Sequence, residues 1–280
     1  AFWRPQPTFT LENVEPFRAG LTIDGHEEEK GDLPIHIVLA EEGEEFDALQ
    51  RELRARSQRE DNAIFWAVPL SDAIDHETVE LFRSREMESR RGRDARTADQ
   101  ARLLADERAR ARRHLSELQR LMKLACLAGS AYFRGNDRSP GGGAGDVGKA
   151  VTTMMGQVLP DVFTRFGDGA AKSADAKRGL DALLSAADLQ GLPSVFTALN
   201  LLRDEGGKTV IDAENALALR DVYGEIERGA NEGRKATGKS LTEHFGGAPY
   251  GWQLEVVRLF VASLMRAGRI QMTHKGDAID

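Results

Sequence analysis

The chain has 280 residues, of which 41% are hydrophobic and 30% charged, a composition typical of globular domains. At roughly 150 residues per domain, this length predicts about two domains with a sizeable apolar core. The 45 acidic residues outnumber the 38 lysines and arginines, and the formal charge of −7 excludes a globally basic, DNA-coating protein but not local basic patches.

The compartment follows from cysteine usage and from hydropathy. Cys126 is the single cysteine and cannot form an intrachain disulfide, which fits the reducing cytoplasm. No stretch approaches the roughly 20 apolar residues of a membrane span, and the N-terminus lacks a signal pattern, so no membrane partner is expected. Because the chain starts with Ala1, Phe2 and Trp3, we expect a piece of a longer protein.

Residues 1–90 are predicted to form a mixed α/β segment. Alternating apolar residues over 35–39 indicate a strand, and the compact apolar run 63–68, ended by Pro69, indicates a short buried strand. Apolar residues at helical spacing follow each strand, the second set after a cap at Ser71: Phe46, Leu49 and Leu53, then Ile74, Val79 and Phe82.

Residues 91–205 are predicted to form a helical domain. A capping box at Thr97–Gln100 starts a long helix that runs to about Leu127, and residues 131–133 follow as a short extended piece. Further helices are expected over 149–166, where Pro160 predicts a kink or break, over 174–187 and over 195–202.

Arginine is concentrated at the start of this domain. Eleven arginines and six acidic residues lie between Arg83 and Arg113. Such a stretch could line a nucleic-acid path, because arginine pairs with phosphate in a bidentate manner. A solvated helix laced with i,i+4 charge pairs is the favoured interpretation.

Gly206, Gly207 and Lys208 predict a domain boundary, and residues 206–280 a winged-helix-like domain. Helices are expected over 211–228, from Lys239 to the glycine pair 246–247, and over 254–267. A strand over 269–273 and a turn at 275–276 follow. The predicted fold class is therefore α+β and mostly helical, with a small α/β N-terminal part, a long helical middle and a C-terminal winged-helix-like unit.

Basic residues lie where a winged helix touches phosphates or a partner. These candidate contact residues are Arg234, Lys235, Lys239, Arg269, His274 and Lys275. The third helix offers few polar side chains for reading base edges, so sequence-specific recognition is disfavoured. A protein-binding wing and a wing that binds DNA without sequence preference remain equally open.

Three other motifs suggest chemistry that the surrounding residues do not complete. The loop 143–149 resembles a phosphate-binding loop through Lys149, but Ala150 stands where a Mg²⁺-binding hydroxyl is needed. His76 and Glu80 have the spacing of zinc ligands but lack a third ligand nearby. Cys126 has no adjacent base and is interpreted as a core residue. No catalytic residue, metal site or cofactor is predicted for this chain.

The segment Leu241–Trp252, with the apolar helix and Gly268-Arg269-Ile270 after it, carries a family resemblance. It resembles the F-x-x-x-P-Y-G-W … L-x-x-x-G-x-I region of the large P-loop proteins of bacteriophage-exclusion (BREX) and phage growth limitation systems. The resemblance extends over most of residues 60–280. In this sequence its specific part is Phe245, Pro249, Tyr250, Gly251 and Trp252, which look structural because a rigid turn would let the aromatic rings fill the gap between the second and third helices.

The resemblance implies a non-catalytic segment of a cytoplasmic anti-phage ATPase, acting as a scaffold and a DNA- or partner-binding module. ATP and Mg²⁺ would then bind elsewhere in the parent chain. The expected partners are other subunits of a phage-defence complex and double-stranded DNA. Two alternatives stay open: a free-standing nucleotide-binding enzyme that uses the loop 143–149, and a winged-helix transcription regulator.

Overall fold

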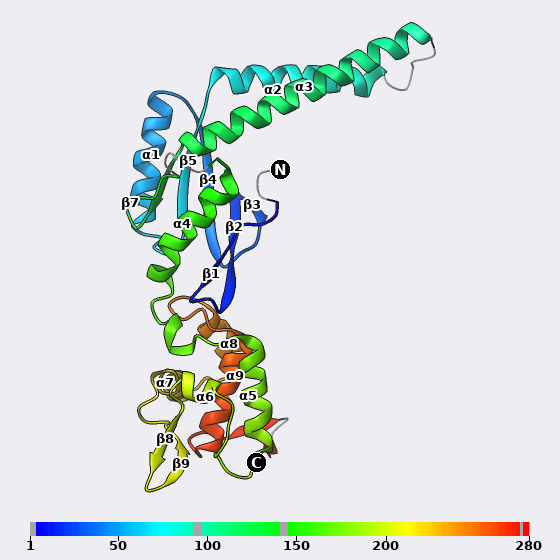
Figure 1. Ribbon diagram of the computed structural model, residues 1–280. Coiled ribbons are helices and arrows are strands. Elements are labelled where there is room, and N and C mark those ends of the chain that lie inside the picture. The colour runs from blue at the N-terminus through cyan, green and yellow to red at the C-terminus, as the bar shows by residue number, and fades with distance from the viewer. Residues whose placement is uncertain (1–3, 92–96, 141–144, 275–276, 280) are drawn as a thin grey trace. The chain divides into compact units, whose positions relative to one another are not determined.

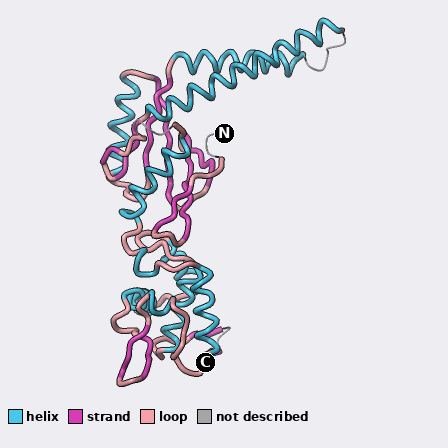
Figure 2. Tube along the Cα trace, viewed as in Figure 1, coloured by secondary structure: helices cyan, strands magenta, loops and turns pink. Residues whose placement is uncertain are grey.

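The computed structural model describes residues 4–91, 97–140, 145–274 and 277–279 (Figure 1). They divide between two compact units, one comprising residues 1–9 and 17–158 and the other residues 10–16 and 159–280. The division therefore falls inside the segment 91–205 that the sequence suggested as one domain. Helices predominate over strands along the trace in Figure 2, which confirms the predicted mostly helical α+β class.

A mixed sheet forms the centre of the first unit. Its strands run in the order β1-β2-β4-β5-β6-β7, and β3 pairs with β2. β2, β4 and β5 are parallel, whereas β6 is antiparallel to β5. The strand bounds are β1 Thr8–Leu11, β2 Glu15–Ile23, β3 His26–Glu29, β4 Leu33–Glu41, β5 Ile64–Leu70, β6 Ser130–Phe133 and β7 Asn136–Asp137.

The core of this unit lies around β5, whose residues from Ile64 to Val68 are completely buried. Helix α1 (Glu44–Ser57) packs Leu53 against Phe65 on one face. Pro69 does not end β5, contrary to the sequence prediction, because it pairs with Ala40 of β4. On its other side β5 pairs with β6 from Phe65 to Ala67, and the pairing stops there. A residue without a backbone N–H therefore fits at position 69.

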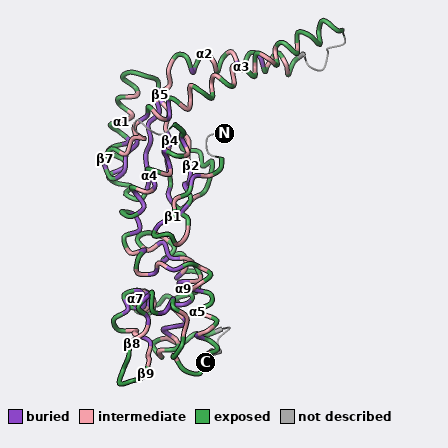
Figure 3. Tube along the Cα trace, viewed as in Figure 1, coloured by how far each residue is buried: buried purple, intermediate pink, exposed green. Residues whose placement is uncertain are grey.

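Helices α2 (Asp72–Arg91) and α3 (Ala98–Ala128) pack on each other and extend away from the sheet as a pair (Figure 1). The predicted capping box at Thr97 and Gln100 is present. Figure 3 shows exposed and intermediate residues along most of this pair and buried residues in the sheet. α4 (Val147–Val162) contains Pro160 and ends two residues after it.

The second unit is built mainly of helices. Its elements after α4 are the 3-10 helix η1 Phe166–Gly169, α5 Ser173–Ser185, α6 Val195–Ala198, β8 Leu202–Glu205, β9 Lys208–Ile211, α7 Leu217–Asn231, α8 Gly238–Gly246, α9 Leu254–Arg266, β10 Met272–His274 and β11 Asp277–Ile279. β8 pairs with β9 and β10 with β11, both antiparallel. Helices α7, α8 and α9 followed by the β10–β11 hairpin are the predicted winged-helix outline.

The glycine pair Gly206–Gly207 was wrongly interpreted as a domain boundary. It forms the tight turn between β8 and β9, with φ of +64° and +86°. A two-residue hairpin turn of this kind requires positive φ at both positions, which glycine adopts without strain. The hairpin also shortens two predicted helices: α6 ends at Ala198, and α7 begins at Leu217 rather than at Ile211.

Candidate functional site

The motif Phe245–Trp252 forms a tight turn between α8 and α9. The carbonyl of Gly247 accepts the backbone N–H groups of Tyr250 (3.0 Å) and Gly251 (2.9 Å), and Gly251 has a φ of +66°. Trp252 then donates its backbone N–H to the carbonyl of Phe245 (2.8 Å). This closed turn fixes the directions of the Tyr250 and Trp252 rings.

Those rings form one aromatic cluster. Trp252 stacks on Phe245 at 5.1 Å between ring centroids and meets the edge of Phe260 of α9 at 5.2 Å. Tyr250 lies 4.8 Å from Phe245 and 4.7 Å from Trp252. Phe245 and Trp252 are buried, and through Phe260 their stack packs α8 against α9.

Arg165, just before η1, holds the motif from the other side. Its backbone N–H donates to the carbonyl of Pro249 (2.9 Å), and its own carbonyl accepts the indole Nε1–H of Trp252 (3.1 Å). Its guanidinium pairs with Asp168 and Asp221, each at 2.5 Å, and lies 5.7 Å from the Tyr250 ring centroid. The hydrogen bond to Asp168 is the main reason that the pKa of Arg165 is raised, and burial followed by the Asp221 carboxylate raises the pKa of Tyr250.

Sequence reasoning did not find Arg165, Asp168 or Asp221. Arg165 and Trp252 are 87 positions apart, and no spacing rule connects them. The local sequence signal for this contact is the glycine at position 169. The structure explains it, because a Cβ there would lie 2.7 Å from the Trp252 indole.

α9 is the third helix of the winged-helix outline, and its solvent face is narrow. Seven of its residues are buried, from Val256 to Leu264. α5 packs along it, and the small residue Gly179 of α5 allows Leu259 to approach. Of the residues in α9, only Leu254, Arg258 and Arg266 are classed as exposed.

Both exposed arginines of α9 have partners within the unit. Arg258 pairs with Glu255 at 2.9 Å. Arg266 donates to the carbonyls of Ala186 (2.8 Å) and Ala187 (3.1 Å), directly after α5. Reading a base edge requires polar side chains that are free to reach it, and α9 offers none among its exposed residues.

The predicted basic contact residues are only partly brought together. Arg234, Lys235 and Lys239 are exposed in the loop before α8 and in its first turn. Arg234 pairs with Glu232, and Lys239 lies 3.7 Å from Glu243, whereas Lys235 has no ion pair among the described residues.

The wing contributes less than expected to this set. Arg269 pairs with Glu214 at 2.7 Å. His274 ends β10, and its side chain lies outside the described part of the structure, as does the whole of Lys275.

The described end of the loop 143–149 does not present free amides to a phosphate. The Asp146 carboxylate accepts the backbone N–H groups of Gly148 (2.8 Å) and Lys149 (3.3 Å) at the start of α4. A phosphate at this helix N-terminus would meet that negative charge instead. Residues 143 and 144 of the loop lie outside the described residues.

The other two motifs likewise show no assembled site. Glu80 pairs with Arg83 at 2.5 Å, and no cluster of three metal-ligating side chains occurs among the residues that the structure describes. Cys126 is buried in α3, and burial raises the pKa of its thiol to about 11, so it is a core residue. Within the described ranges, no helix is long and apolar enough to span a membrane.

The three-helix arrangement α7–α9 with its β10–β11 hairpin defines a winged helix-turn-helix unit. Residues 199–280 match the family model of the winged helix-turn-helix domain of the BREX ATP-binding protein BrxC. The match confirms, for residues 199–280, the resemblance that the Pro-Tyr-Gly-Trp segment suggested: this part of the chain is similar to the winged helix-turn-helix domain of BrxC. A search of curated proteins and a search of solved structures give no significant match.

Proposed function

We propose that this chain is a non-catalytic segment of a BREX P-loop ATPase and acts as a scaffold whose winged-helix unit binds a partner subunit. The BrxC domain match over residues 199–280 supports the membership. The observation that carries the partner-binding role is the burial of α9 beneath α5, because it removes the helix that a winged-helix reader inserts into the major groove.

The proposed contact surface is the basic loop of Arg234, Lys235 and Lys239. All three side chains are exposed, and they precede or begin α8, whose N-terminal amides are capped by Thr237. A cationic loop beside a positive helix end favours an acidic partner surface. We therefore expect the partner subunit to present carboxylates to this loop.

The test uses the complete BREX system in cells challenged with phage, with this protein affinity-tagged in its full-length form. We expect the triple variant Arg234→Glu/Lys235→Glu/Lys239→Glu to lose co-purification of the other BREX subunits and to lose phage protection. Lys208→Glu/Arg220→Glu is the control, because both residues are exposed on the same unit and neither forms an ion pair with another described residue. Equal losses in the two variants, or full protection by the triple variant, would reject the loop as the contact.

The non-catalytic part of the proposal has its own test. The purified chain should hydrolyse no ATP above background, and Lys149→Ala should leave nucleotide binding unchanged because Asp146 already occupies the adjacent amides. ATP hydrolysis that Lys149→Ala abolishes would favour the nucleotide-binding enzyme. Tight binding to one DNA sequence over scrambled duplexes would favour a transcription regulator.

A further inference from the structure

The outer side of α3 carries a row of cations, which we call the α3 basic face: Arg102, Arg112, Arg113, Arg120 and Lys123. Spacings of seven and eleven residues place them on one side of an α-helix, within a row about 30 Å long at 1.5 Å per residue. Arg102, Arg112 and Arg113 are exposed.

Most of these cations are unpaired. No ion pair or hydrogen bond joins Arg102, Arg112, Arg113 or Lys123 to a carboxylate among the described residues. Arg120 alone pairs with an acid, Glu117, at 2.6 Å, and that hydrogen bond lowers the pKa of Glu117.

Two acids of α3 lie on or beside the face: Asp106, seven residues before Arg113, and Glu117, which lines the same depression as Arg112 and Arg113. Other acids near α3 pair away from the face. Glu107 pairs with Arg110, and His114 reaches Glu77 of α2 at 2.7 Å on the side of the helix that packs on α2. Arg108 likewise bonds to Glu88 of α2 at 2.7 Å. The five cations outnumber Asp106 and Glu117 on this side of α3, so it carries net positive charge in a chain whose formal charge is −7.

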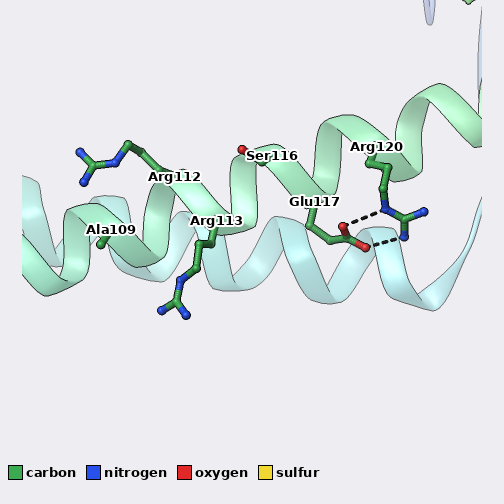
Figure 4. Close-up of a pocket in the computed structure, with 6 residues that line it drawn as sticks. All are labelled: Ala109, Arg112, Arg113, Ser116, Glu117 and Arg120. Atoms are coloured by element: carbon green, nitrogen blue, oxygen red, sulfur yellow. Dashed lines mark hydrogen bonds and ion pairs between the residues drawn. The ribbon is translucent and has the colours of Figure 1, made fainter.

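The shape of the face suits a polyanion that lies along it. Figure 4 shows the small residue Ser116 between Arg113 and Arg120, with Ala109 on the far side of Arg112, and the depression there is lined by α3 residues alone. Small residues between long arginines allow a surface to approach the helix closely. The exposed large apolar side chains beside the row are Leu103 and Leu124, one at each end, and the row carries none of the Trp and Tyr anchors that are enriched at the centres of protein–protein interfaces.

The geometry points to duplex DNA, and we propose that the α3 basic face binds its phosphate backbone without reading sequence. The pair Arg112–Arg113 and the pair Arg120–Lys123 are centred roughly 13 Å apart along the helix, close to the ≈12 Å width of the B-DNA major groove. The two pairs can therefore reach phosphates on both strands across that groove. The major groove of duplex RNA is deep and narrow, so the same spacing fits RNA less well. This inference concerns the first unit and does not depend on the proposed role of the winged-helix unit.

The experiment measures binding of the full chain to a fluorescent 30-base-pair DNA duplex by anisotropy between 50 and 300 mM salt. Five phosphate contacts should give a log–log salt slope of about −4.5, at about −0.9 per contact. For Arg112→Gln/Arg113→Gln the slope should become about −2.7. If the wild type and the variant have the same affinity when extrapolated to 1 M salt, the affinity of the variant at 0.1 M salt should be about 60-fold lower than that of the wild type.

Arg83→Gln/Arg90→Gln is the matched control, because it removes the same charge from α2, where each arginine already pairs with a glutamate. It should change affinity less than about threefold. Arg112→Lys/Arg113→Lys should keep the wild-type slope, because lysine keeps the positive charge at both positions. This variant therefore distinguishes the loss of phosphate contacts from a disturbance of the helix. Circular dichroism of each variant checks that α3 is intact.

Several results would overturn the inference. They are no binding of the wild-type chain at 50 mM salt, equal loss in the two glutamine variants, or tighter binding of a matched RNA duplex. Binding of poly-glutamate at a charge concentration at which DNA does not bind would assign the face to an acidic protein instead. Loss of binding in the Arg234/Lys235/Lys239 triple variant, with full binding by Arg112→Gln/Arg113→Gln, would move the DNA contact to the winged-helix unit.

Discussion

Replacing Gly169 by alanine tests how tightly η1 packs on the Pro-Tyr-Gly-Trp motif. The new Cβ would lie 2.7 Å from Cε2 and Nε1 of the Trp252 indole, whereas ordinary contacts are 3.4 Å or more. The backbone of Gly169 is not in the positive-φ region, so alanine adds only this clash. The indole cannot move freely, because it stacks on Phe245 and donates to the Arg165 carbonyl.

Overpacking of this kind costs about 1–3 kcal/mol. For a unit of this size that corresponds to a fall of roughly 3–15 °C in its Tm. In a Trp252→Leu background the ring atoms that clash are absent, so Gly169→Ala should cost less than about 0.5 kcal/mol. The free energy of unfolding is measured on the full chain by urea titration, followed by far-UV circular dichroism.

Gly224→Ala serves as the control, because it lies in the interior of α7 and its Cβ would meet nothing within 4 Å. It should stabilise the chain by about 0.5–1 kcal/mol through helix propensity. The reasoning fails if Gly169→Ala costs the same in the wild-type and Trp252→Leu backgrounds, or if it costs nothing in either.

Three further predictions concern titration, thiol reactivity and the arginine beneath the motif. Burial lowers the pKa of His36, so the folded state binds its proton less readily than the unfolded state. Stability should therefore fall as pH drops below about 6.5, and His36→Phe should reduce the fall between pH 7.5 and pH 5 in urea titrations. Because the buried Cys126 thiol has a pKa raised to about 11, native protein at pH 8 should react with Ellman's reagent far more slowly than urea-unfolded protein, and rapid native labelling would contradict its core position. Arg165→Met removes the partner of two half-buried aspartates and should cost about 1–3 kcal/mol of unfolding free energy; a loss under about 0.5 kcal/mol would show that the pairs are solvent-screened.

The sequence predicted two central elements of the first unit from local signals. β5 and α3 came from a compact apolar run and a capping box, and both are present. β3 was missed because its four residues, His26–Glu29, are all exposed and carry no alternation. It exists because β2 offers hydrogen bonds to its backbone, which no side-chain pattern records.

The candidate site was predictable only in its local part. Phe245 and Trp252 were found through a contiguous motif, and the structure places them in one stack. Arg165 was out of reach because its bonds to Pro249 and Trp252 are made through its backbone, and any residue except proline could supply the backbone N–H. Gly206 was misread because a glycine pair suits a linker and a tight hairpin equally well, and only strand pairing separates the two.

The winged-helix fold does not by itself fix how much of its third helix is exposed, but the distribution of apolar residues around that helix does. A helix that reads DNA keeps one polar side for the groove, whereas α9 buries residues at successive positions such as Val256 and Val257 and again at Leu259 and Phe260. Apolar residues at consecutive positions point in directions about 100° apart, so one neighbouring surface cannot cover them all. α5 supplies the second surface, and Ala176, Gly179 and Leu183 recur on its buried side at helical spacing. It follows that α5 and the winged helix form one packed unit, and that exposing α9 to DNA would require removing α5 from its core.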